Sequence, residues 1–155
     1  MAAVARRELE LGNRPAIALA RAAMFGLTID PAGGCTSVDA LLPATVAVSG
    51  RGHEFACALV AVEVARRAAV DARLALTPNA AMLVVHDGGP AWSVLMPEYG
   101  NISWVPLPAS VMAEEDVQLR CPHDAARTLI QLASELLSPR QLPRALALLD
   151  ELAVH

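Results

Sequence analysis

The segment from Arg51 to Arg73 limits the possible folds of this chain more than any other part of it. It reads RGHEFACALVAVEVARRAAVDAR, which predicts a helix that is apolar on nearly every side. Between Phe55 and Ala69 only Glu63, Arg66 and Arg67 are charged, so the wide polar face of a surface helix is missing. We therefore expect a central helix that other elements cover on several sides.

The residues after this helix carry apolar runs that are typical of strands and are separated by turn signals. Asp87-Gly88-Gly89 and Tyr99-Gly100-Asn101 are typical reversals between antiparallel strands. The strands that we expect are 72–76, 81–86, 91–96 and 102–105. The pattern predicts an α+β fold in which the central helix packs on a small antiparallel sheet.

Further helices are expected on both sides of this core. Asn13 and Pro15 are typical of a helix start, and Gly26 ends a helix whose apolar positions include Met24. A short helix over 38–48 is interrupted or begins near Pro43. Towards the C-terminus, residues 124–137 and 142–152 repeat apolar residues at spacings of three and four, which predicts a helical hairpin. We expect a single domain over 1–155, with a core of 1–116 and the C-terminal hairpin over 117–155.

The composition favours a protein-binding function over nucleic-acid binding. Of 155 residues, 55% are hydrophobic and 18% charged, so surplus apolar surface is expected to be buried against a protein partner or in a homo-oligomer. A net charge of −4 with scattered arginines argues against nucleic-acid binding. Charges of both signs near the N-terminus argue against a signal peptide, and no apolar run reaches the roughly 18 residues of a membrane helix. We expect a cytoplasmic protein without membrane contact.

The cysteine pattern argues against disulfides and metal. Cys35, Cys57 and Cys121 form no CxxC pair, which fits a reducing compartment. Cys121-Pro122-His123 brings only two metal ligands together, and the acidic run 114–116 is interpreted as a solvated loop. We predict no metal site and no cofactor.

Four segments of the chain resemble the SirB family of transglutaminase-like proteins. Residues 52–70, GHEFACALVAVEVARRAAV, match a family segment without a gap, and VEVARR is the most specific part. TPNAAMLV at 77–84 is similar to the family's PGHFLV strand, and MPEYG at 96–100 to its DPFxGG turn. Residues 129–153, which end in RALALLDELA, are similar to the family's closing helical pair. The resemblance implies a transglutaminase-like core with flanking helices.

The chain departs from this family at the positions that carry its chemistry. Transglutaminase-like enzymes use a cysteine at the start of the core helix, a histidine on the next strand and an aspartate after it. The resemblance places these roles at Glu54, Ala80 and Met96, and none of these residues can fill them. It therefore implies a pseudoenzyme whose fold is kept for another function.

The favoured function is that of a non-catalytic protein-binding or assembly subunit. Trp92, Tyr99 and Trp104 lie on or beside the predicted strands, where they are either packing anchors or a recognition patch for a partner. A small-molecule binding module that uses an apolar groove at the former active site is a second, also non-enzymatic, possibility.

A cysteine-dependent acyl transferase or peptidase is the enzymatic alternative. Cys57 would be its nucleophile, with His53 or His86 as base, and Glu54 near His53 could serve as acid or base. The simpler interpretation makes Cys57 a buried hydrophobic residue, His53 a capping or surface residue and His86 a solvent-exposed residue at a strand end. Accessibility of the Cys57 thiol therefore separates the two functions.

Overall fold

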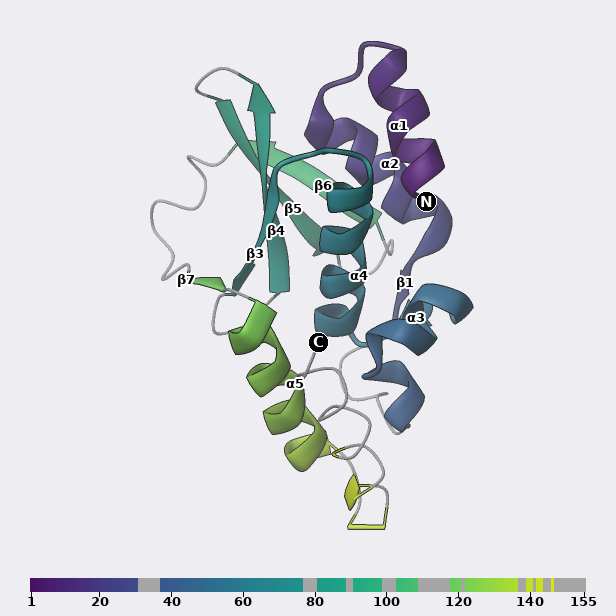
Figure 1. Cartoon of the computed structure of the whole chain (residues 1–155), viewed down its shortest axis with the longest axis vertical. Helices are drawn as coiled ribbons and strands as arrows, with labels where there is room; N and C mark the ends of the chain where they lie inside the picture. Colours follow the sequence, from purple (N-terminus) through teal and green to yellow (C-terminus); the bar gives the residue numbers. More distant parts are fainter. Residues whose placement is uncertain are drawn as a thin grey trace.

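The computed structural model of this chain describes residues 1–30, 37–76, 81–88, 91–98, 103–108, 118–120, 122–136, 139–140, 142–143 and 146. Helices cover one face of an antiparallel sheet, with one helix running centrally along it (Figure 1). The α+β class predicted from the sequence is confirmed.

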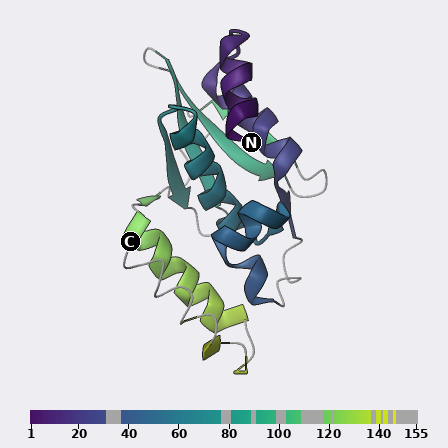
Figure 2. The ribbon, with the colours of Figure 1, turned by 45° about the vertical axis from the view of Figure 1, so that its right-hand side comes forward.

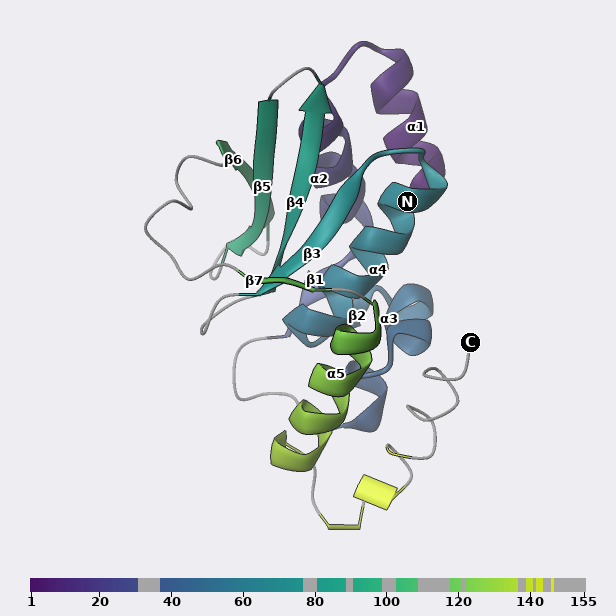
Figure 3. The same ribbon diagram turned by 60° about the vertical axis from the view of Figure 1, so that its left-hand side comes forward.

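The sheet has five strands in the order β6-β5-β4-β3-β7, and every neighbouring pair is antiparallel (Figure 3). The strands are β3 (Ala72–Leu76), β4 (Ala81–Gly88), β5 (Ala91–Glu98), β6 (Ser103–Pro108) and β7 (Gln118–Arg120). The first four correspond to the four strands expected from the sequence. Strand β7 was not expected, and it lies at the beginning of the segment that was assigned to the C-terminal hairpin.

The two faces of the sheet differ in what covers them. Strand pairing puts Leu74, Leu83 and Leu95 side by side on one face, and these three belong to the main hydrophobic core. Helices α2 (Pro15–Gly26) and α4 (Glu54–Arg67) pack on this inner face. Because side chains alternate along a strand, Arg73 and Trp92 belong to the opposite, outer face.

Helix α4 is the central helix that the sequence predicted. Its N-cap is His53, whose Nδ1 accepts a hydrogen bond from the Phe55 backbone N–H at 3.2 Å. Three of its charged residues, Glu63, Arg66 and Arg67, form ion pairs near its C-terminal end. The side chains that it buries line most of its circumference: Phe55, Ala56, Cys57, Ala58, Val60, Ala61, Val64 and Ala65.

A pair of helices precedes the core. Helix α1 (Ala2–Glu10), which was not expected, packs against α2, and Glu8 of α1 forms an ion pair with Arg21 of α2. In Figure 1 this N-terminal pair lies at the top, beside the upper end of α4. The expected helix over 38–48 is present as a 3-10 turn, η1 (Val38–Ala40), and helix α3 (Pro43–Ser49).

Short parallel strands tie these helices to the start of α4. β1 (Thr28–Ile29), which follows α2, pairs with β2 (Arg51–Gly52), which follows α3. Gly50 ends α3 in the left-handed conformation with φ of 70°, and a Cβ at this position would lie 2.7 Å from the Gly26 carbonyl oxygen. The C-terminal ends of α2 and α3 are therefore held close together.

Helix α5 (Pro122–Leu136) extends away from the sheet at the end opposite the N-terminal pair (Figure 2). It buries Ala125, Leu129 and Ala133 against the core, with Arg127 and Glu135 on its exposed side. This is the first helix of the predicted hairpin. The structure describes only residues 142–143 and 146 of the second.

Candidate functional site

Three of the four candidate catalytic residues meet at the N-terminus of α4. His53 is the N-cap, Glu54 is the first helical residue and Cys57 follows one turn later. His86 does not join them, because pairing with Trp92 places it on the outer face of the sheet, whereas α4 packs on the inner face. His86 therefore cannot act as a base for Cys57.

The Cys57 thiol is fully enclosed. The residue is 0% exposed, and Sγ donates to the backbone carbonyls of Gly52 at 3.6 Å and Thr28 at 3.8 Å. Burial, together with the nearby carboxylates of Asp30 and Glu54, raises the thiol pKa from 9.0 to about 12, and the hydrogen bond with Gly52 opposes this shift. The simpler interpretation of Cys57 as a buried hydrophobic residue is confirmed.

His53 offers no positive charge that could stabilise a thiolate. Burial lowers the pKa of its imidazole, which favours the neutral ring, and Nδ1 is occupied by the Phe55 N–H. A reactive cysteine needs the opposite surroundings, an imidazolium or another cation beside the sulfur. The prediction that His53 caps the helix is confirmed.

Glu54 has the least usual environment of the three residues. The Ala81 backbone N–H donates a hydrogen bond to its carboxylate, whereas Oε2 is buried with no hydrogen-bond partner. Burial raises the carboxyl pKa, and the bond from Ala81 opposes this shift. The bond also joins the start of α4 to the start of β4, so residue 54 lies beside the first residue of that strand.

Position 96 lies on the neighbouring strand. β5 pairs with β4 so that Leu95 faces Leu83, which puts position 96 next to the first residues of β4. Of the three positions that carry chemistry in the resembling family, 54 lies at the start of α4, which packs on the inner face of the sheet. Position 96 alternates with Leu95 and therefore falls on the outer face with Trp92, and position 80 lies outside the described residues. A glutamate, an alanine and a methionine occupy these positions in the sequence, so none of them carries the cysteine, histidine or aspartate of that chemistry.

The three aromatic residues predicted to form a recognition patch, Trp92, Tyr99 and Trp104, do not share one face of the sheet as far as the described residues show. Trp92 lies on the outer face, half-buried, with its ring centroid 4.8 Å from that of His86 and 5.9 Å from the guanidinium carbon of Arg73. Pairing of Trp104 with Pro97 places residue 104 on the inner face. Tyr99 lies outside the described residues. His86, expected to be solvent-exposed, is half-buried in this contact with Trp92.

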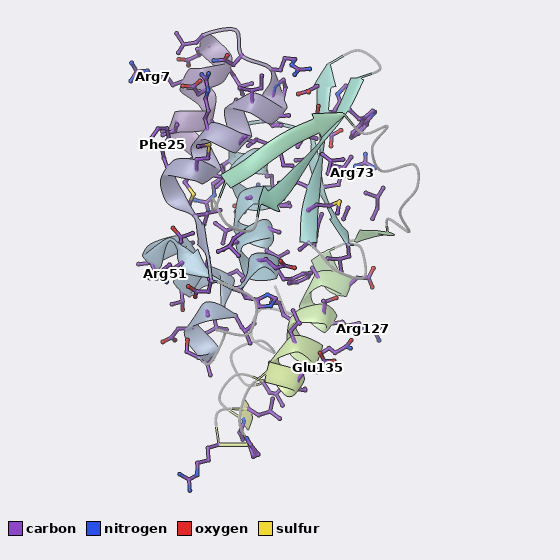
Figure 4. All side chains as sticks on the ribbon, turned by 180° about the vertical axis from the view of Figure 1, so that it is seen from behind. Arg7, Phe25, Arg51, Arg73, Arg127 and Glu135 are labelled. Atoms are coloured by element: carbon purple, nitrogen blue, oxygen red, sulfur yellow. The ribbon has the colours of Figure 1, made fainter. Side chains whose placement is uncertain are left out.

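Three large apolar side chains are exposed elsewhere, near the ends of α2 and α3. They are Met24, Phe25 and Val48, which are 57%, 83% and 90% exposed, and we refer to them together as the Phe25 patch. The Thr28 N–H donates to the Gly50 carbonyl at 2.6 Å, which keeps the two helix ends adjacent. Figure 4 shows Phe25 on the side of the molecule opposite Arg73 and the outer face of the sheet.

Sequence reasoning missed this patch because Met24 continues the apolar spacing of α2 and was expected to point inward. The available signal was Phe25, directly before the Gly26 that ends the helix. A large aromatic residue next to Met24 widens the apolar stripe beyond what one packing face covers.

Three further observations concern the function. Among the described residues, no three His, Cys, Asp or Glu side chains are grouped so that they could hold a metal ion. None of the described helices combines the length and the apolar character needed to cross a bilayer. Comparisons of the chain with protein-family models, with curated proteins and with solved structures find no match.

Proposed function

We propose that this protein is a non-catalytic, transglutaminase-like protein that works by binding another protein through the Phe25 patch. The hydrogen bond from Ala81 to Glu54 supports the transglutaminase-like part, because it joins position 54 to the start of β4. The resemblance places the nucleophile at position 54 and the histidine at the residue that precedes Ala81 in the sequence. The sequence resemblance and the Ala81–Glu54 contact therefore both support a transglutaminase-like fold.

The surroundings of Cys57 support the absence of catalysis. A thiol with a pKa of about 12, two carbonyl partners and two nearby carboxylates is protonated at neutral pH and shielded from substrate. The cysteine-dependent acyl transferase or peptidase would require the opposite electrostatics. The Phe25 patch carries the binding part of the proposal, since its large apolar side chains are exposed on two adjacent helix ends and exposed apolar surface of this kind favours an interaction.

A small-molecule binding module has less support. A cavity between α2, α4 and β5 has a volume of about 10 Å³ and apolar walls. Ligand pockets measure on the order of 300–1,000 Å³ and carry a few polar groups that orient the ligand.

Alkylation tests the non-catalytic part. In a Cys35→Ala, Cys121→Ala background, Cys57 is the only thiol. A rise in pKa from 9.0 to about 12 lowers the thiolate fraction at pH 7.5 roughly 1,000-fold, so iodoacetamide should label native Cys57 at least that much more slowly than the urea-unfolded chain. Labelling faster than a free thiol would revive the enzymatic alternative.

A matched pair of variants tests the binding part. Phe25→Ser with Val48→Ser removes the centre of the patch, whereas Leu11→Ser removes a side chain that is 68% exposed and lies before the other end of α2. We expect cross-linked complexes from the native lysate, or self-association in light scattering, to be lost in the double variant and kept in Leu11→Ser. Equal binding by all three proteins would exclude the patch as the contact surface.

A further inference from the structure

The N-terminal pair of helices buries mainly small side chains against the rest of the fold. Helix α1 fully buries only Ala5, with Val4 and Leu9 partly buried, and the buried side chains of α2 are alanines with the single exception of Leu19. Each alanine removes only one methyl group from water, and the hydrophobic effect grows with the apolar area that is buried. The hydrophobic effect therefore holds this pair less firmly than it holds α4, which buries phenylalanine and valines.

The contact between the pair and the core is also incompletely filled. The cavity of about 10 Å³ lies in this contact, and its apolar walls lose dispersion contacts across the gap. It is lined by Met1, Leu19, Ala23 and Leu27 from the N-terminal side, and by Ala61, Val64 and Leu95 from α4 and β5.

Asp87 supplies a polar attachment between the pair and the sheet. Its side chain is 0% exposed, although it lies near the end of the β4–β5 hairpin. Oδ1 accepts the Ala16 backbone N–H at 2.8 Å, and Oδ2 accepts the Ser93 hydroxyl at 2.5 Å and lies 3.7 Å from Nη1 of Arg14. The N-cap residue Arg14 makes no side-chain cap of its own. A carboxylate 71 positions away therefore caps α2, and its charge suits the positive end of that helix.

We propose that Asp87 is a latch, and that α1 and α2 open together from α4 and the sheet when this latch is released, while the remaining elements stay folded. Local opening of contiguous helices that share few apolar contacts is a general property of folded proteins. The latch concerns the isolated chain and does not depend on the proposed binding function.

Amide hydrogen exchange of the isolated full chain tests the latch. Hydrogen bonds to a charged group contribute on the order of 1.5–3 kcal/mol, so Asp87→Ala should speed exchange of the α1 and α2 amides about 10- to 100-fold. The amides of α4 and of β3, which exchange by unfolding of the whole chain, should remain slower than those of α1 and α2 in the wild type and in the variant. Asp71→Ala is the matched control, because the Asp71 side chain is 54% exposed and its nearest charged partner, Arg73, is 3.8 Å away.

Milder variants keep the test valid if Asp87→Ala does not fold. Ser93→Ala removes one partner of the carboxylate, and Asp87→Asn removes its charge but keeps an acceptor for the Ala16 N–H. Both should give a smaller acceleration of the α1 and α2 amides, which should again exchange faster than those of α4. Exchange of α1 and α2 at the same rate as α4 would show that the pair opens only when the whole chain unfolds, and unchanged rates in α1 and α2 would show that Asp87 does not hold the pair. Either result overturns the proposal.

Discussion

The buried thiol of Cys57 should make this protein lose stability in mild alkali. In the unfolded chain the thiol ionises near its ordinary pKa of 9.0, whereas in the folded protein it stays protonated up to about 12. Above pH 9 the unfolded state therefore binds fewer protons than the folded state. The stability of the folded protein is therefore unaffected by this thiol well below pH 9, and it falls as the pH rises from 9 towards 12.

The size of the loss follows from the same shift. Once the unfolded thiol is fully ionised, one pH unit costs about 1.4 kcal/mol, and raising the pH from 9 to 11 should remove roughly 2 kcal/mol of unfolding free energy. That is a large fraction of the ~5–15 kcal/mol by which folded domains are usually stable. The full burial of the side chain means that solvent does not screen the effect.

Urea unfolding in the presence of a reductant, at half-unit steps from pH 7.5 to 10.5, measures how the free energy of unfolding changes with pH. Cys57→Ala is the comparison, because alanine does not ionise and the small cavity that it leaves has the same cost at every pH. The chain has one tyrosine and no lysine, and both proteins share all other titrating groups. The difference in stability between them should change by about 1.4 kcal/mol per unit above pH 9. Parallel curves up to pH 10.5 would mean that the folded protein accommodates the thiolate.

Three substitutions near α4 have effects that can be worked out from local geometry, each measurable by chemical unfolding. Ala69→Gly should stabilise the fold by about 1 kcal/mol, because Ala69 is exposed and held at φ of 59°, where glycine has no steric cost; a lower midpoint would contradict this. Gly52→Ala should cost about 1–3 kcal/mol, since its methyl group would lie 2.7 Å from the Ala40 carbonyl oxygen; unchanged stability would mean that the backbone yields easily. His53→Ala should cost about 1 kcal/mol at pH 7.5 through loss of the cap. Because burial lowers the His53 pKa, the wild-type advantage should shrink as the pH falls below 6.5, and a constant difference would refute the role of the neutral ring.

The central helix and its four following strands could be predicted because their signals are local. The segment around Phe55 to Ala65 has no polar face, and such a helix has few places in a fold except the core. The predicted ends of the strands lie close to the observed ones, because Asp87-Gly88-Gly89 and Tyr99-Gly100-Asn101 interrupt the apolar runs. The capping role of His53 and the burial of Cys57 follow from their positions in the same helix.

Other features depend on pairing that a single sequence does not reveal. Trp92 and Trp104 have similar surroundings in the sequence, and only the register shows that they belong to opposite faces. Helix α1 buries a single alanine, so its hydrophobic signal was weak. Asp87 looked like an ordinary turn residue, because its partner at Ala16 belongs to a distant helix.

Strand β6 has a consequence for how this protein meets other chains. It forms one edge of the sheet, and its residues 106 and 108 are both prolines. Proline lacks the backbone N–H, and edge strands accommodate it where the nitrogen faces away from the neighbouring strand. A foreign strand that approached this edge would find donors missing at alternate positions, and in the described part of the chain the other edge, β7, has three residues. We therefore expect this protein to resist the edge-to-edge strand pairing that begins amyloid growth. Its contacts with other chains are expected to form through its helices.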